Sequence, residues 1–219
     1  VDSLSGMEVM GVYADASGNL QPIPGFTALF QGDKVEVTGI VQQFDGNTQF
    51  TTLDVNSVTL LTSGDLAPSA FVPKQLTVGD FNDNNRVNIV TTGEYWQNGF
   101  VELQNVTVVQ VTPFSGSRVS FDIQDANGNV LNVSDRFLAQ RTPSHTTVNP
   151  NTPSTTGTGS FVAPSVGTFY SSIKGIVRHS ANGCTGGTGR GYELNPFDDS
   201  HYQVGASAPS ITNVLNFPP

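Results

Sequence analysis

Oxygen-bearing side chains at alternating positions mark the segment "GDFNDNNRVNIVT", residues 79–91. Asp80, Asn82 and Asn84 take the first, third and fifth places of a calcium-binding loop, and the backbone carbonyl of Arg86 takes the seventh. Calcium binds such loops through carboxylate, amide and carbonyl oxygens. Calcium is therefore the one cofactor that the sequence indicates.

Two positions of the same loop argue against a metal. The twelfth place, where calcium loops carry a bidentate acid, is Thr91, and the sixth, where they carry glycine, is Asn85. Asp and Asn side chains also hydrogen-bond their own backbone in turns that hold no metal. A polar turn without a cofactor is therefore the alternative interpretation, and the one we favour.

A second polar cluster, "ELNPFDDSH" at residues 193–201, contains Glu193, Asp198, Asp199 and His201. Its spacing allows the carboxylates to gather around a cation at a loop. The alternative is that the segment ends the last strand of a β-barrel and has a structural role only. We favour the structural role.

The remaining reactive residue types lack the context that catalysis needs. His179 and His201 have serine neighbours, but no serine stands in a nucleophile elbow. The glycine-rich stretch at 182–191 has no lysine and no following helix, so it does not match a phosphate-binding loop. Its Cys184 is the only cysteine, which excludes an intrachain disulfide. The sequence therefore predicts no catalytic residue and no enzyme.

Aromatic side chains are the candidates for ligand binding. Tyr95 and Trp96 precede a long predicted strand, and Phe44 and Phe50 flank the turn of a predicted hairpin. Exposed aromatic rings stack on bases or sugars, but in β-barrels they also fill the core or cover an edge. We favour packing and keep the four residues as candidates.

Composition limits the classes of partner. Charged residues make up only 12% of the 219 residues, and the net charge is −9. An acidic surface repels a phosphate backbone, and the nine Lys and Arg form no run, so nucleic acid is disfavoured. No apolar run is long enough to cross a membrane as a helix, so we expect no membrane insertion.

Period-2 alternation of apolar residues dominates the chain and predicts an all-β fold. The predicted strands are 8–14, 34–44, 48–61, 100–112, 118–124, 130–133, 170–180, 192–195 and 202–204, with a short helical turn at 77–82. In "FVELQNVTVVQV" the apolar residues move from odd positions, Val101 and Leu103, to even ones, Val106 and Val108. A strand changes parity through an irregularity, so we expect a bulge near Gln104 and Asn105.

An internal repeat organises the strands. The segments "VEVTGIVQQF" (35–44) and "SSIKGIVRHS" (171–180) share Gly-Ile-Val, and each runs through a turn into a closing strand. Two copies of one β-unit are the economical interpretation. The second copy contains all its strands, whereas the first lacks its opening strands.

The repeat and the composition divide the chain into four parts. Residues 1–66 are the first barrel without its opening strands, 67–99 a connector, and 100–205 the second barrel. Within the second barrel, the Pro/Thr/Ser-rich segment 141–168 is expected to be a surface excursion with little packing. Residues 206–219 are expected to be a linker.

The stretches "GDKVEVTGIVQQFDGNTQF", "GFVELQNVTVVQVTP" and "IKGIVRHSANG" resemble OB-fold-like modules of large secreted bacterial proteins. Such modules accompany extracellular nucleases of the endonuclease/exonuclease/phosphatase type and also occur in surface proteins. The resemblance covers residues 8–62 and 100–204 and implies two tandem OB-like barrels. The start, "SGMEVMGVYAD", resembles the third strand of such a module, and the nuclease's own catalytic motifs do not appear.

These observations lead to one expected function and one alternative. We expect a non-catalytic structural or adhesive module of a large secreted or cell-surface bacterial protein, which assembles with neighbouring domains or subunits. A glycan-binding face fits this role. The alternative is a nucleic-acid-binding accessory module of an extracellular nuclease, which requires a local basic groove.

Overall fold

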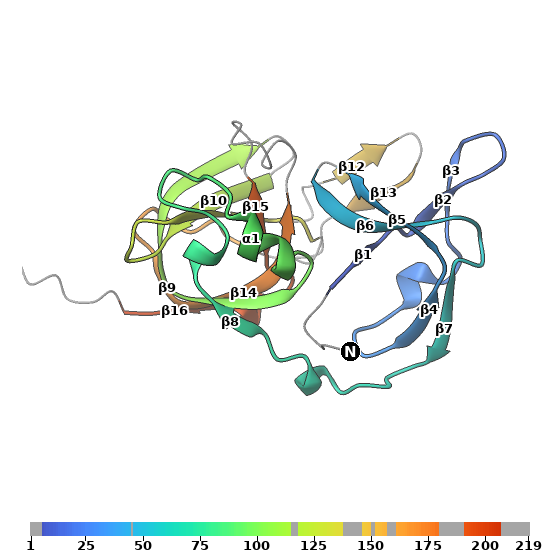
Figure 1. Cartoon of the computed structure of the whole chain (residues 1–219), viewed down its shortest axis with the longest axis horizontal. Helices are drawn as coiled ribbons and strands as arrows, with labels where there is room; N and C mark the ends of the chain where they lie inside the picture. Colours follow the sequence, from blue (N-terminus) through green and yellow to red (C-terminus); the bar gives the residue numbers. More distant parts are fainter. Residues whose placement is uncertain are drawn as a thin grey trace, which may run out of the picture.

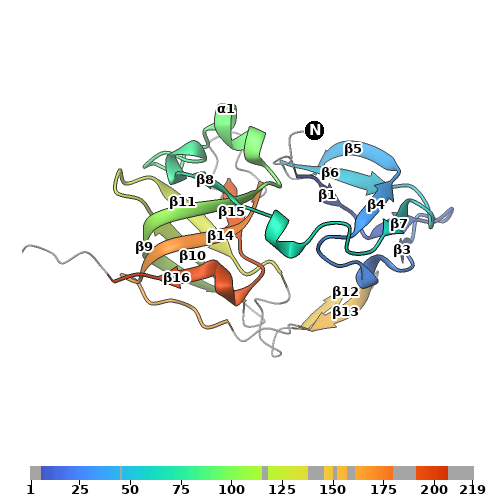
Figure 2. The ribbon, with the colours of Figure 1, turned by 90° about the horizontal axis from the view of Figure 1, so that it is seen from below.

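The computed structural model describes residues 6–44, 46–114, 118–137, 146–149, 152–156, 161–179 and 191–206. Strands dominate these ranges, and the longest helix described, α1, has four residues (Val90–Gly93). The predicted all-β class is confirmed. Figures 1 and 2 show two bodies: a first lobe, residues 6–66, and a barrel formed by residues 100–206 except 146–149 and 152–156, which lie beside the first lobe.

The elements follow one another in chain order. The first lobe contains β1 (Glu8–Val9), β2 (Val12–Ala14), β3 (Leu20–Pro22), η1 (Phe26–Ala28), β4 (Lys34–Val37), β5 (Gly39–Phe44), β6 (Asn47–Thr52) and β7 (Val58–Thr62). The connector contains η2 (Pro68–Ala70), β8 (Lys74–Leu76), η3 (Val78–Asp80), α1 and η4 (Glu94–Trp96). The barrel part contains β9 (Phe100–Phe114), β10 (Arg118–Gln124), β11 (Val130–Ser134), β12 (Thr146–Asn149), β13 (Thr152–Thr156), β14 (Phe169–His179), β15 (Tyr192–Asn195), η6 (Asp199–His201) and β16 (Tyr202–Val204).

Five strands close the barrel. They are hydrogen-bonded in the order β9-β10-β11-β15-β14, and β14 returns to pair with β9. β11 and β15 are parallel, and the other four pairs are antiparallel. This closed arrangement is consistent with the five-stranded Greek-key barrel of the OB-fold. β8 adds to the start of β9 in parallel, and β16 adds to the start of β14.

One hydrophobic core fills the barrel. Its members come from all five strands and from η3, and each is almost completely buried; they include Val78, Val101, Leu103, Val106, Val108, Phe121, Ile123, Leu131, Val133, Ile173, Val177 and Leu194. Burying this continuous apolar surface is the main stabilising term for a small barrel. Inward and outward side chains alternate along each strand because successive residues point to opposite faces.

The predicted change of parity in β9 is confirmed, but its mechanism differs from the prediction. Leu103 and Val106 are both buried although their positions differ by three. Asn105 has φ 54°, in the left-handed region that asparagine tolerates, and β9 keeps its register with β14 through this point. The register shift of β9 lies instead against β10, between Asp122 and Ile123.

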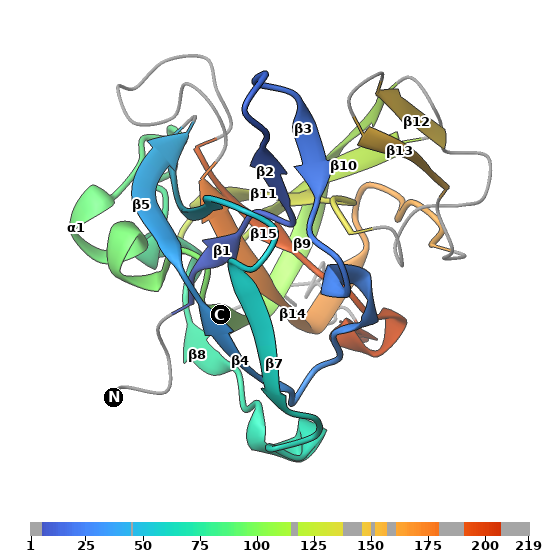
Figure 3. The same cartoon turned by 90° about the vertical axis from the view of Figure 1, so that its right-hand side faces the viewer.

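The first lobe consists of three small sheets. Their strand orders are β1-β6-β5, β2-β3 and β4-β7, so no closed barrel forms among residues 6–44 and 46–66. Figure 3 looks onto this lobe, in which β4 and β7 run side by side. The prediction of two tandem barrels is therefore confirmed only for the second.

Three predicted strands of the first lobe are interrupted. Residues 8–14 divide into β1 and β2, 34–44 divide into β4 and β5, and 48–61 divide into β6 and β7. The longest interruption is the turn between β6 and β7. The side chains of this lobe therefore belong to shorter strands than the period-2 pattern indicated.

The internal repeat extends to the register of the strands. Val41 of β5 lies opposite Phe50 of β6, as Val177 of β14 lies opposite Leu194 of β15. The parallel pair repeats as well, because β1 joins β6 at Phe50 and β11 joins β15 at Leu194. The strand that follows each turn, β7 or β16, returns antiparallel to the first half of the repeated strand, β4 or β14.

The turn between β6 and β7 and the turn between β15 and β16 are also of the same kind in the two copies. Asp54 Oδ1 accepts a hydrogen bond of 2.8 Å from the backbone N–H of Asn56. Asp198 Oδ1 accepts one of 2.8 Å from the backbone N–H of Ser200. Both aspartates therefore stabilise one turn type, so Asp198 has a structural role in the acidic segment, whereas cation binding by that segment is a separate prediction.

The shared glycine of the repeat has a steric cause. A Cβ on Gly175 would lie 2.7 Å from the carbonyl carbon of Asn195, and a Cβ on Gly39 would lie 2.3 Å from the carbonyl oxygen of Thr51. Both contacts are far inside the van der Waals limit, and the partner in each case is backbone. Only glycine allows the neighbouring strand to approach this closely.

The connector and the excursion depart in part from prediction. The helical turn expected at 77–82 is confirmed by η3. The excursion at 141–168 contains the antiparallel pair β12–β13, and its Phe161 stacks on the core residue Phe121 with 6.2 Å between ring centroids. The expectation of little packing in this segment is therefore wrong for these residues.

Candidate functional site

The side chains of the predicted calcium loop bond partly to their own turn and partly to the barrel strands. Asp80 Oδ2 accepts from both the backbone N–H and the hydroxyl of Thr77, at 2.8 Å each, and so caps η3. The side chain of Asn82 is buried, and its Nδ2 donates to the carbonyl of Val130 on β11 at 3.1 Å. Asn82 Oδ1 has no hydrogen-bond partner among the described residues.

The other predicted ligands point to different partners. Asn84 Oδ1 accepts from the side chain of Asn85, and the carboxylate of Asp83 caps the turn. Arg86, at φ 61°, forms an ion pair with Asp122 of β10 through its guanidinium. No group of three His, Cys, Asp or Glu side chains converges among the described residues. Calcium binding by Asp80, Asn82, Asn84 and Arg86 stays a prediction.

The four predicted aromatic residues lie on two separate elements. In η4, Trp96 packs against the barrel core, with Lys74 Nζ 5.9 Å from its ring centroid, and Tyr95 is 59% exposed beside it. In the hairpin β5–β6, Phe50 packs against Gly39, whereas Phe44 is 62% exposed. The structure therefore uses Trp96 and Phe50 for packing.

Phe44 and Phe50 lie on opposite faces of their hairpin. Phe50 is paired with Val41, and Phe44 is three positions further along β5, where the side chain points the other way. The two rings therefore do not form one stacking surface. A ligand-binding role for Phe44 and Tyr95 stays a prediction.

A cleft between the first lobe and the barrel was not predicted from the sequence. Its central part has a volume of about 430 Å³ and a mostly apolar lining of Gln31, Phe71, Phe100, Phe137, Ile176 and Phe197. We call it the interlobe cleft. Phe197 connects the rings, because its centroid lies 5.5 Å from that of Phe100 and 5.8 Å from that of Phe137.

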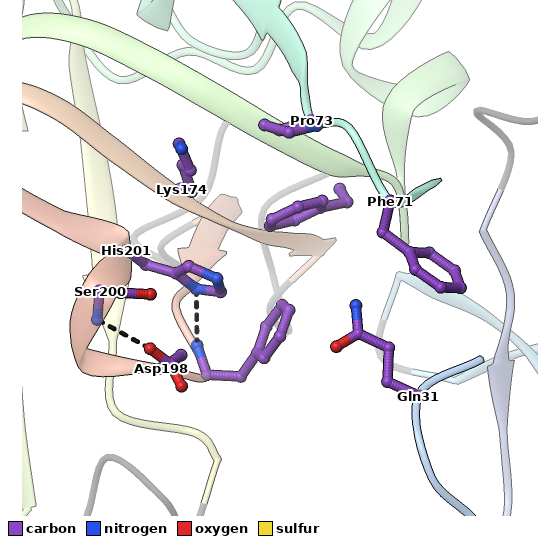
Figure 4. Close-up of a pocket in the computed structure, with 9 residues that line it drawn as sticks. Gln31, Phe71, Pro73, Lys174, Asp198, Ser200 and His201 are labelled. Atoms are coloured by element: carbon purple, nitrogen blue, oxygen red, sulfur yellow. Dashed lines mark hydrogen bonds between the residues drawn. The ribbon is translucent and has the colours of Figure 1, made fainter. Parts of the chain in front are cut away.

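Charged side chains line both ends of the interlobe cleft. At one end, a pocket of about 290 Å³ adds Lys174, Asp198 and His201 to the lining (Figure 4). At the other end, a pocket of about 250 Å³ adds Glu8, Arg136 and Arg178. Figure 4 shows Gln31 and Phe71 facing Lys174 and His201 across the space. Such a lining fits an apolar or ring-shaped group with polar ends.

Hydrogen bonds fix the polar end near His201. Its Nδ1 accepts from the backbone N–H of Phe197 at 3.4 Å, and its ring lies edge-on to that of Phe197, 4.3 Å between centroids. Burial lowers the pKa of His201, and the negative charge of Asp198 opposes this effect. The hydroxyl and the backbone N–H of Ser200 lower the pKa of Asp198. His201 is therefore neutral at pH 7 and acts as a hydrogen-bond acceptor.

Several residues singled out from the sequence lie outside the described ranges. These are Cys184, most of the glycine-rich stretch 182–191, and Ser180, the serine that follows His179. For the interlobe cleft, the available signal in the sequence was weak. Phe137 and Phe197 stand in turns just beyond strand ends, outside the period-2 pattern, and that position was the only indication of their role.

Comparisons with known proteins give no further assignment. No protein-family model, no curated protein and no solved structure matches this chain. Within the described residues, none of the helices has the length and apolar character needed to span a membrane.

Proposed function

We propose that this chain is a non-catalytic structural module made of two OB-type units, the first of which is incomplete. Its role is to hold neighbouring parts of a large secreted or cell-surface bacterial protein in a fixed orientation. The observation that carries the proposal is the polar junction between the first lobe and the barrel. The low charge and the many Thr and Asn residues support a position outside the cell.

The junction contains a half-buried ion pair. Glu8 of β1 accepts hydrogen bonds from Arg178 of β14 and from the side chain of Asn47. The side chain of Arg178 is 11% exposed and that of Glu8 is 26% exposed. Arg136 reaches the same carboxylate at 3.9 Å, with a side chain that is 46% exposed. Charge-assisted bonds of this kind fix both distance and direction.

Two buried amide side chains complete the junction. Gln97 Oε1 accepts from the backbone N–H of Thr48 at 2.7 Å, and its Nε2 donates to the carbonyl of Gly46 at 2.9 Å. Asn98 Nδ2 donates to the carbonyl of Thr48 at 2.8 Å. Gln97 and Asn98 are only 6% and 8% exposed. Both residues lie in the connector, and the backbone N–H of Asn98 donates to the carbonyl of Val177 on β14 at 2.7 Å, so the end of the connector ties β6 of the first lobe to the barrel.

Glu8→Ala tests this proposal. Removing one partner of a fully buried pair costs about 3–5 kcal/mol; because Glu8 is a quarter exposed, we expect a loss of about 1–3 kcal/mol in the free energy of unfolding. Arg136→Ala is the matched control, since it removes the exposed partner of the same carboxylate and should cost less than about 1 kcal/mol. Urea denaturation measures both.

A second measurement addresses the fixed orientation itself. We expect a single thermal transition and a single rotational correlation time for residues of the first lobe and of the barrel. Separate correlation times for the two bodies in the unmodified chain would contradict a rigid module. Equal stability of the Glu8→Ala and Arg136→Ala variants would show that the junction does not hold them together.

A further inference from the structure

Several strand edges of the first lobe have no strand partner among the described residues. β1 and β5 are the outer strands of the sheet β1-β6-β5, and β4 pairs with β7 alone. In the barrel, the corresponding strands have one more partner each. β14 pairs with β9 over Phe169–Ile176, and β11 pairs with β10. The first lobe therefore repeats β11, β14 and β15 but not β9 and β10.

Core positions of the repeat are exposed where these two strands are missing. Val41 corresponds to Val177 by the register of the closing strands, and it is 55% exposed, whereas Val177 is completely buried. Met7 corresponds to Leu131 by the register of the parallel pair, and it is 45% exposed, whereas Leu131 is completely buried. The first lobe thus leaves two core positions of the repeat, Val41 and Met7, about half exposed, and Met7 also borders the interlobe cleft.

We propose that a two-stranded antiparallel β-hairpin, joined directly ahead of β1 on the same polypeptide, completes the first lobe. Its first strand pairs with β4 and β5, and its second strand pairs with β1. The inference rests on the proposed pair of OB-type units, and it names the surface and the segment that closes it.

The barrel indicates which kind of segment completes the first lobe and where along the polypeptide that segment lies. β9 and β10 form an antiparallel hairpin, and the five residues Asp125–Asn129 lead from β10 directly into β11. A repeat of the same order places the missing hairpin directly before β1. An edge with unpaired backbone N–H and C=O groups binds an added strand through a ladder of main-chain hydrogen bonds.

Strand β10 also indicates the chemistry of the missing hairpin. Phe121 lies opposite Val133 and Ile123 lies opposite Leu131, and all four side chains are buried. The strand beside β1 therefore needs large apolar residues at every second position to cover the exposed core. Polar residues at the positions between them face solvent.

A grafted hairpin tests the proposal without knowledge of the natural segment. A copy of residues 100–129 is placed ahead of residue 6, so that the copied turn leads into β1. Covalent linkage gives a high effective concentration, so a modest fit suffices. We expect hydrogen exchange of the backbone amides of β4 and β5 to slow by about tenfold or more relative to the unmodified chain.

Two matched variants show whether the grafted hairpin covers the apolar face. Val41→Asp should change the melting temperature of the unmodified chain little, because Val41 is exposed there, but should destabilise the grafted chain strongly. A graft whose copies of Phe121 and Ile123 are both replaced by aspartate should give no protection of β4 and β5. Both results together support the proposal.

Two outcomes overturn the proposal. One is unchanged exchange of β4 and β5 in the grafted chain together with equal effects of Val41→Asp in both chains. The other is a dimer of the unmodified chain whose β4 and β5 amides are already protected, since a second copy would then be the occupant. Neither outcome depends on Glu8 or the lobe junction, so this proposal and the proposed rigid module fail separately.

Discussion

Replacing Gly175 by alanine places a methyl group against the backbone of β15. The new Cβ would lie 2.7 Å from the carbonyl carbon of Asn195 and 2.8 Å from its carbonyl oxygen and from the backbone nitrogen of Pro196. Because all three neighbours are backbone atoms, no change of rotamer removes the overlap. The strand pair β14–β15 has to shift, and this pair helps to close the barrel.

The expected loss of stability at Gly175 follows from two opposing terms. Forcing a methyl group into a packed site costs about 1–3 kcal/mol. Alanine also restricts the unfolded chain more than glycine, which returns about 0.4–1 kcal/mol. Taken at the middle of both ranges, the net destabilisation is about 1.3 kcal/mol. For a chain of this size, each kcal/mol lowers the melting temperature by about 2–4 °C.

Urea denaturation and calorimetry of the Gly175→Ala variant measure this loss. Gly79→Ala is the control, because the atom nearest to its Cβ is the amide nitrogen of Asn129, the end of a side chain that can move. We expect the control to change the free energy of unfolding by less than about 1 kcal/mol. A Gly175→Ala variant as stable as the unmodified chain would refute the steric explanation of the shared glycine.

Three further predictions concern charge and ligands. Burial lowers the pKa of His201 below its ordinary 6.5, so on acidification the unfolded chain binds a proton that the folded chain does not. The free energy of unfolding should therefore fall as the pH drops from 7.5 to 5.5, and it should fall less in the His201→Gln variant. Because Asp80 already caps η3, a chelator should shift the melting temperature by less than about 1 °C; a larger fall would establish a bound cation. Because Glu8 is ion-paired with Arg178, we expect no gel shift with single-stranded DNA at low salt, and a salt-sensitive shift would favour the accessory-module alternative.

The sequence was most informative where side chains alternate against a common core. The strand pattern and the Gly-Ile-Val repeat predicted β9, β10, β11, β14 and β15 with ends within about two residues. The repeat was detectable because the steric demand at Gly39 and Gly175 is local and the same in both copies. Which strands pair with one another depends on residues far apart in the sequence. The alternation of apolar residues therefore did not predict how the strands close into a barrel, and the structure was needed to show it.

Where polar side chains decide the structure, the sequence was less informative. A carboxylate that caps a turn and one that binds a cation have the same residue type and spacing, so the sequence does not distinguish the two roles at Asp80 and Asp198. The irregularity near Asn105 is a left-handed residue and not a bulge, because backbone dihedrals do not follow from alternation. The interlobe cleft depends on how two bodies meet, which no single segment encodes.

The many pairings of β14 also determine when the barrel can form during synthesis. One edge of β14 pairs with β9, and the opposite edge pairs with β16 near its start and with β15 near its end. The ring therefore stays open until residues up to Asn195 have left the ribosome. At about 5–20 residues per second, β9–β11 wait several seconds for their partners. Pairings this distant in sequence also slow folding. The newly made chain is therefore most exposed to aggregation and proteolysis just before its last strands arrive.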